Sequence, residues 1–107
     1  MSAHKKLVRK KFRDSVLKRD RNRCVLCKNA ENIDVHHITD RTLMPGGGYV
    51  RENGISLCQE HLELAEIHLH NEEGAGTEAV NPTQLYSKIG SSYTKALEAS
   101  KRLERLG

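Results

Sequence analysis

Large apolar side chains are scarce in this 107-residue chain, which has no tryptophan, one phenylalanine and three tyrosines. Hydrophobic residues make up only 36% of it, so we expect one small domain with a thin core, near the size at which a bound metal or a partner often adds stability. No apolar run is long enough to predict a signal peptide or a membrane span. We therefore expect a cytoplasmic protein that does not contact a membrane.

Cysteine is also scarce, and its number is odd. An odd count and a CxxC spacing favour metal-bound thiolates in a reducing compartment over a disulfide framework. Cys24 and Cys27 can present two thiolates on one tight turn, and Cys58-x-x-His61 offers a second pair of ligands. The sequence therefore predicts a structural zinc ion held by these four side chains. The alternative is small buried cysteines and an exposed histidine.

Acidic residues are few at the start of the chain. Residues 1–23 contain ten Lys or Arg and two Asp, a net charge of +8, whereas residues 24–107 contain eight basic and twelve acidic side chains, a net charge of −4. Positive charge gathered in one block is typical of proteins that bind a phosphate backbone. A solvated basic face without a partner is the alternative.

Hydrophobic periodicity predicts an amphipathic helix over residues 5–19, where Val8, Phe12 and Val16 recur every four positions. Alternation then predicts a strand over 32–38, and glycines predict a flexible loop over 39–49. The dipeptide Asn53-Gly54 is a turn signal before a second, antiparallel strand at 55–58. A helix over 59–70 is predicted to follow.

The last third of the chain predicts a mobile linker and two more helices. Residues 71–81 are rich in Gly and Glu, as linkers are. Asn81 and Pro82 supply a cap and a first-turn proline for a helix over 82–89, which Gly90 ends. A last helix over 93–106, capped by Ser91 or Ser92, is expected to use three leucines for packing: Leu97, Leu103 and Leu106.

The segment Asp34-Val35-His36-His37-Ile38 is expected to carry the chemistry. Successive side chains of a strand point to opposite faces, so the two histidines cannot do the same job. One can hold a metal ion while its neighbour takes a proton. Asp34 shares a strand face with His36 and is a candidate ligand or hydrogen-bond partner. Two packed or exposed histidines without a function are the alternative.

Taken together, these motifs resemble the HNH endonuclease family. The resemblance covers residues 8–67 and rests on the CxxC pair, the segment 35–38, the segment 51–58 with His61, and Ala65-Glu66. It implies an α+β fold, the zinc-ribbon-stabilised ββα-metal or His-Me finger core, with two antiparallel strands and a helix. Residues 1–70 would then form the nuclease domain with its basic helix, and residues 71–107 a linker and a helical extension packing on it.

The resemblance also implies roles for individual residues. His37 matches the general base, His36 a ligand of the catalytic ion, and Asn53 the residue that ties a loop across the strands and orients the base. Leu62 departs from the pattern, because the family has a metal-binding histidine there. Glu66, one helical turn further, is the leading substitute ligand beside Asp34. Oxygen ligands favour Mg²⁺ or Mn²⁺ as the catalytic ion, and His68 and His70 are weaker candidates for its ligands.

The predicted function is a metal-dependent endonuclease that nicks double-stranded DNA as a monomer with little sequence specificity. The alternative is a zinc-containing DNA-binding module whose catalytic site has degenerated at Leu62. A homodimer through the C-terminal helices is a further expectation, and the resemblance implies a phage or prophage origin. The residues predicted to contact DNA are basic: Lys6, Arg9, Lys10, Arg13 and Arg51.

Overall fold

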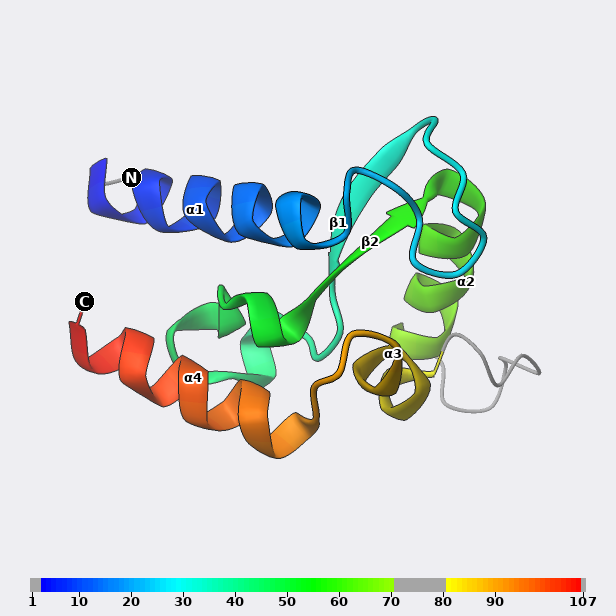
Figure 1. Ribbon diagram of the computed structural model, residues 1–107. Helices are drawn as coiled ribbons and strands as arrows, with labels where there is room; N and C mark the ends of the chain where they lie inside the picture. Colours follow the sequence, from blue (N-terminus) through cyan, green and yellow to red (C-terminus); the bar gives the residue numbers. More distant parts are fainter. Residues whose placement is uncertain (1–2, 71–80, 107) are drawn as a thin grey trace.

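The computed structural model describes residues 3–70 and 81–106, with side chains for residues 5–66 and 81–106. It is an α+β fold of two antiparallel strands and four α-helices within these ranges (Figure 1). The α-helices are α1 (Ala3–Arg19), α2 (Gln59–His70), α3 (Pro82–Lys88) and α4 (Tyr93–Leu106). The strands are β1 (Ile33–His37) and β2 (Gly54–Cys58), joined through 3₁₀ segments at Arg41–Leu43, Pro45–Gly48 and Arg51–Asn53.

Helix α1 packs its apolar stripe on the strands, as its periodicity predicts. Phe12 and Val16 are buried, while the neighbouring basic residues Lys11, Arg13 and Lys18 are exposed. A Cβ atom added at Gly54 of β2 would lie 2.5 Å from Cγ2 of Val16 and 2.7 Å from Cε1 of Phe12, so the absence of a side chain allows this close approach. The helix begins at Ala3, two residues earlier than expected.

Strands β1 and β2 pair in a register that places Ile33 opposite Cys58 and His37 opposite Gly54. All five residues of β2 are buried, and α2 follows Cys58 without a loop. Helices α1 and α2 lie to the left and right of the two strands in Figure 1, and both contact them. The thin sheet is therefore covered by helices, which supply the apolar surface that two strands alone lack.

The loop between the strands, for which the sequence predicted flexibility, makes specific contacts with its surroundings. The N–H of Gly46 donates to the Glu104 carboxylate of α4 at 3.1 Å, and Nδ2 of Asn53 donates to the carbonyl of Gly48 at 3.2 Å. Glycine here serves tight turns with positive φ rather than mobility, for example φ +82° at Gly47.

Both C-terminal helices lie close to their predicted positions. Asn81 caps α3 by accepting the N–H of Gln84 at 2.8 Å, and Gly90 follows with φ +69°. Ser92 caps α4, whereas Ser91 donates to the carbonyl of Glu52 at 2.9 Å. Helix α4 buries Ala96 and Ala99. Leu106 is 83% exposed, so the packing role predicted for Leu106 is wrong.

The predicted linker falls almost entirely on residues 71–80, which lie outside the described residues. In the part of the chain that is described, no helix is both long and apolar enough to cross a membrane.

Candidate metal centre and histidine pair

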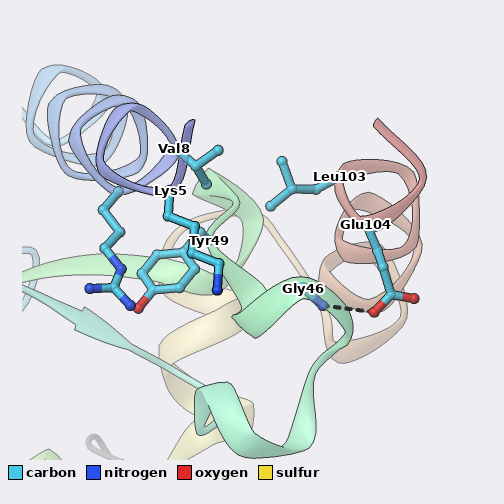
Figure 2. A pocket seen from close by; sticks show the side chains of 7 residues that line it. Lys5, Val8, Gly46, Tyr49, Leu103 and Glu104 are labelled. Atoms are coloured by element: carbon cyan, nitrogen blue, oxygen red, sulfur yellow. Dashed lines mark hydrogen bonds between the residues drawn. The ribbon is translucent and has the colours of Figure 1, made fainter. Parts of the chain in front are cut away.

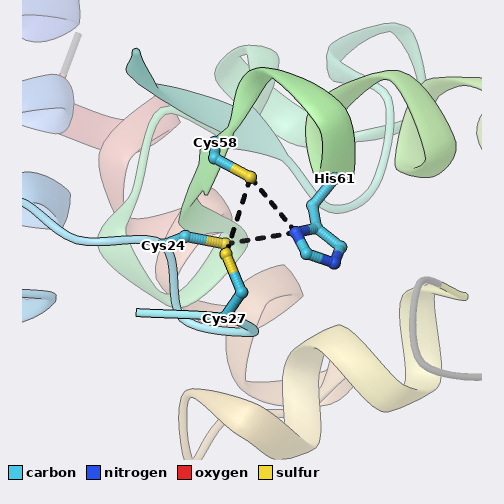
Figure 3. A group of neighbouring side chains, drawn as sticks. All are labelled: Cys24, Cys27, Cys58 and His61. Atoms are coloured by element: carbon cyan, nitrogen blue, oxygen red, sulfur yellow. Dashed lines mark hydrogen bonds between the residues drawn. The ribbon is translucent and has the colours of Figure 1, made fainter. Parts of the chain in front are cut away.

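The four side chains that the sequence predicts as zinc ligands lie close together in the structure. One ligand atom from each of Cys24, Cys27, Cys58 and His61 lies within 4.8 Å of the other three (Figure 3). The sulfurs of Cys27 and Cys58 are 3.7 Å apart, and Nδ1 of His61 is 3.6 Å from Cys24 and 3.2 Å from Cys58. A tetrahedral zinc ion with Zn–S bonds of about 2.3 Å separates two thiolate sulfurs by about 3.8 Å. The donor set and its spacing therefore fit zinc.

Local hydrogen bonds present these ligands to one another. The N–H of Lys28 donates to the carbonyl of Cys24 at 2.9 Å, which closes the turn that carries the first two cysteines. The N–H of Val25 donates to the carbonyl of Ser56 at 3.0 Å, fastening that turn to β2. Because β2 ends at Cys58 and α2 begins at the next residue, His61 lies in the first helical turn beside it. A metal ion here would join the turn that carries Cys24 and Cys27 to β2 and α2.

The surroundings of Cys24 favour a thiolate. Burial alone would raise the pKa of its thiol, but backbone hydrogen bonds from Cys58, Cys27 and Leu26 outweigh burial and lower the pKa to about 7. The thiolate is the form that binds a metal ion. This shift supports the assignment of Cys24 as a ligand.

The two histidines of β1 occupy different environments. His36 is 4% exposed and lies opposite Ile55 of β2. His37 is half-buried and contacts α1: its ring stacks on Phe12 with a centroid distance of 4.6 Å, and Tyr49 meets it edge-on at 4.8 Å. Since neighbouring strand residues face opposite sides, His36 projects away from this aromatic group. The predicted division of the pair between two faces therefore agrees with the strand geometry.

His37 is held neutral at physiological pH. Burial, and then the positive charge of Arg41, lower the pKa of its imidazole to about 4. Asp40 opposes them, and Arg9 adds a smaller lowering effect. Its Nε2 atom is buried, and no described residue forms a hydrogen bond with it. A neutral imidazole can accept a proton, but a pKa this low makes it a weak base until another negative charge comes near.

Arg41 and Tyr49 belong to the surroundings of His37, although no sequence pattern pointed to either residue. Arg41 donates from Nη1 to the Tyr49 hydroxyl at 3.1 Å, and the Arg9 guanidinium lies 5.4 Å from the centre of the Tyr49 ring. No motif or spacing marks these residues, because they approach His37 through the folded loop. Two cations therefore flank the histidine that the resemblance marks as the base.

Tyr49 also borders a cavity of about 390 Å³ between α1, the loop and α4 (Figure 2). Val8 of α1 and Leu103 of α4 give it apolar walls, and Glu104 reaches across to the N–H of Gly46. Helix α4 thus contributes to the support of the loop that carries Tyr49.

Asn53 is fully buried and fastens the loop ends, as the resemblance implies for this position. Its Oδ1 accepts from the N–H of Thr39 at 2.9 Å and from the Tyr86 hydroxyl at 2.8 Å. Its Nδ2 donates to the carbonyls of Thr39 at 3.1 Å and Gly48 at 3.2 Å. The residues directly after β1 are therefore held in place by one side chain.

The predicted ligands of a catalytic ion do not form a second metal group. Among the described residues, the Cys₃His cluster is the one set of three or more His, Cys, Asp or Glu with ligand atoms this close. Asp34 is exposed and forms an ion pair with Arg13, and Glu66 is exposed on α2 beside the half-buried Leu62. The side chains of His68 and His70 lie outside the described residues.

The residues predicted to contact DNA are exposed along α1 and beside β2. Two of them form ion pairs with acidic side chains of the same chain. Lys10 pairs with Asp14 at 2.5 Å, and Arg13 pairs with Asp34. Lys6 and Arg51 are exposed.

No family model, curated protein or solved structure matches this chain.

Proposed function

We propose that this protein is a metal-dependent endonuclease of the HNH type that hydrolyses phosphodiester bonds of duplex DNA. The observation that carries the proposal is the placement of His37, a neutral imidazole on β1 with the cations Arg9 and Arg41 acting on it. A phosphodiester needs positive charge around it and a base to activate water, and this arrangement offers both. The order of β1, β2 and α2, with Asn53 fastening the loop, agrees with the ββα-metal core that the resemblance implies.

A bound phosphate would itself improve His37 as a base. Negative charge between Arg9 and Arg41 offsets the two cations that lower the pKa of the imidazole, so the pKa rises toward the range useful near neutral pH. The substrate thereby helps to prepare the group that deprotonates the attacking water.

His36, Asp34 and Glu66 are the proposed ligands of a catalytic Mg²⁺ or Mn²⁺, which would neutralise charge on the leaving oxygen. As they lie, these three residues form no group that fits an ion, and Arg13 pairs with Asp34. We therefore assign no step of the reaction to the ion.

The test is relaxation of supercoiled plasmid with Mn²⁺ or Mg²⁺. One site per chain attacks one strand, so the wild type is expected to give open-circular DNA, and His37→Ala none. Matching zinc content and circular dichroism exclude unfolding as the cause. Leu62→His, which adds the ligand missing from the family's pattern, is expected to raise the rate. Undiminished cleavage by His37→Ala would show that the base is misassigned.

A second candidate function is a zinc-containing module that binds DNA without cutting it. Three observations favour it: Leu62 in place of a ligand, the packing of His37 between Phe12 and Tyr49, and the lack of a second metal group among the described residues. DNA affinity without cleavage in any divalent ion, by both the wild type and Leu62→His, would select this function.

A further inference from the structure

A basic groove lies at the end of α1, apart from the exposed face of that helix. Cys24 and Val25 form part of its wall, and its charged residues come from the end of α1, the cysteine turn and the end of α3. These charged residues are Arg19, Asp20, Arg21, Arg23, Lys28 and Lys88. Five cations thus line the groove with one carboxylate.

That carboxylate is already used by the fold. Asp20 accepts from Nε and Nη2 of Arg19 at 2.8 and 2.9 Å and from the N–H of Ser56 at 2.9 Å, and its side chain is 6% exposed. The other guanidinium contacts of Arg19 are to the backbone carbonyls of Arg51 and Gly54, each at 2.6 Å. Asp20 and Arg19 therefore neutralise each other inside the wall.

The remaining four cations face solvent: Arg21, Arg23, Lys28 and Lys88 are all exposed. Of these, Lys28 also donates to the carbonyl of Val25 at 3.2 Å. With Asp20 and Arg19 compensating each other, the open part of the groove carries uncompensated positive charge.

The backbone presents these cations in a defined way. Arg21 and Lys28 have left-handed φ values of 58° and 66°, and the N–H groups of Asn22 and Arg23 donate to the carbonyls of Leu17 at 2.9 Å and Asp20 at 3.2 Å. Lys88 arrives from the last turn of α3, far along the sequence. The groove is thus built by the fold and is not a run of charge on a loose segment.

We propose that this groove binds the sugar-phosphate backbone of duplex DNA, as a contact additional to the basic face of α1. The choice of DNA as the ligand rests on the proposed function. The positive charge of the groove complements the negative charge of the phosphates. Arg19 connects the groove to the histidine site, because it bonds the carbonyl of Gly54, the residue paired with His37.

Fluorescence anisotropy with a labelled DNA duplex of about 20 base pairs, without divalent ions, tests the proposal over a KCl series. Each phosphate contact adds about −0.9 to the slope of log K against log salt. Lys88→Ala and Arg23→Ala are each expected to weaken binding on the order of threefold near 0.1 M salt and to reduce the slope by about one. The matched control is Lys101→Ala, an exposed cation of α4 outside the groove, which is expected to leave the slope unchanged.

The outcomes separate this inference from the nuclease proposal, because binding and cleavage are measured independently. Binding that depends on Lys88 and Arg23 without any cleavage supports the groove and overturns the nuclease. If DNA is cleaved and both groove variants bind it as tightly as the wild type, the proposed groove contact is wrong. It is also wrong if Lys101→Ala loses as much DNA affinity as the groove variants. Tighter, groove-dependent binding of duplex RNA than of DNA overturns the choice of DNA as its partner.

Discussion

The Tyr86 hydroxyl of α3 donates a hydrogen bond to Oδ1 of Asn53 at 2.8 Å and lies 2.6 Å from Oγ1 of Thr39. Its single proton goes to Asn53, so Thr39 donates to Tyr86. This contact joins the C-terminal helices to the residue that fastens both ends of the loop between the strands. Burial raises the pKa of Tyr86, which keeps the hydroxyl protonated as the donor.

Tyr86→Phe is expected to lower the free energy of unfolding by about 1–2 kcal/mol, because it removes a buried donor and leaves Thr39 without its acceptor. Tyr93→Phe is the matched control, since Tyr93 is 50% exposed, and a change within about 0.5 kcal/mol is expected. Urea unfolding of both variants measures the difference. Equal stability of the two would mean that the contact with Asn53 contributes nothing.

Removing charge next to His37 should move the pKa of its imidazole in opposite directions. Arg41 lowers this pKa and Asp40 raises it, so Arg41→Gln is expected to raise the pKa and Asp40→Asn to lower it. Histidine ring NMR signals followed over pH report both shifts. A shift of the same sign in both variants would contradict the electrostatic account.

Stability should fall in acid because of His37. Its pKa is about 4 in the folded chain and 6.5 ordinarily, so between these pH values the unfolded chain binds a proton that the folded chain does not. The folded state therefore keeps its full advantage above pH 6.5 and loses it progressively as the pH falls to about 4. The upper limit of the loss is about 3 kcal/mol, reduced by solvent screening.

His37→Phe keeps an aromatic ring against Phe12 but cannot titrate. Its unfolding free energy, measured from pH 7 to pH 4, is expected to decline less than that of the wild type. Parallel pH profiles for the two proteins would show that His37 does not lose a proton on folding in this range.

Zinc should be required for the fold, because a thin core is joined at the Cys₃His cluster. Chelation, or Cys58→Ser, is expected to abolish cooperative thermal unfolding and to release one zinc ion per chain. Affinity should also fall at lower pH, since thiols bind zinc as thiolates. Metal analysis and calorimetry check both statements, with Ser87→Ala on the exposed side of α3 as a control. A wild type that melts identically with and without chelator would contradict a structural role.

Gly54→Ala is expected to destabilise the protein by about 1–3 kcal/mol, because the new methyl group would meet Val16 and Phe12 at 2.5 and 2.7 Å. Gly90→Ala meets nothing within 4 Å, and its cost comes from φ +69° alone, about 1 kcal/mol. Thermal unfolding distinguishes them. A smaller loss at Gly54 than at Gly90 would show that α1 shifts easily on the strand.

Local sequence signals were sufficient for the helices and the metal ligands. Apolar periodicity predicted α2, and the caps Asn81 and Ser92 mark the starts of α3 and α4; these are interactions between near neighbours. The CxxC and CxxH spacings likewise predicted which side chains could meet around an ion. By contrast, the glycines of residues 46–48 suggested mobility, because composition alone does not reveal that Glu104 holds the loop.

By itself, then, the sequence determined the short-range features: which segments become helix or strand, that His36 and His37 face apart, and which four residues lie close enough to hold a metal ion such as zinc. Only the tertiary structure decided what surrounds them. Phe12 and Tyr49 reach His37, and Tyr86 reaches Asn53, from distant segments. Such contacts depend on how whole helices pack on the strands, and no spacing in the chain encodes them, because packing is set by shape and burial over the entire fold.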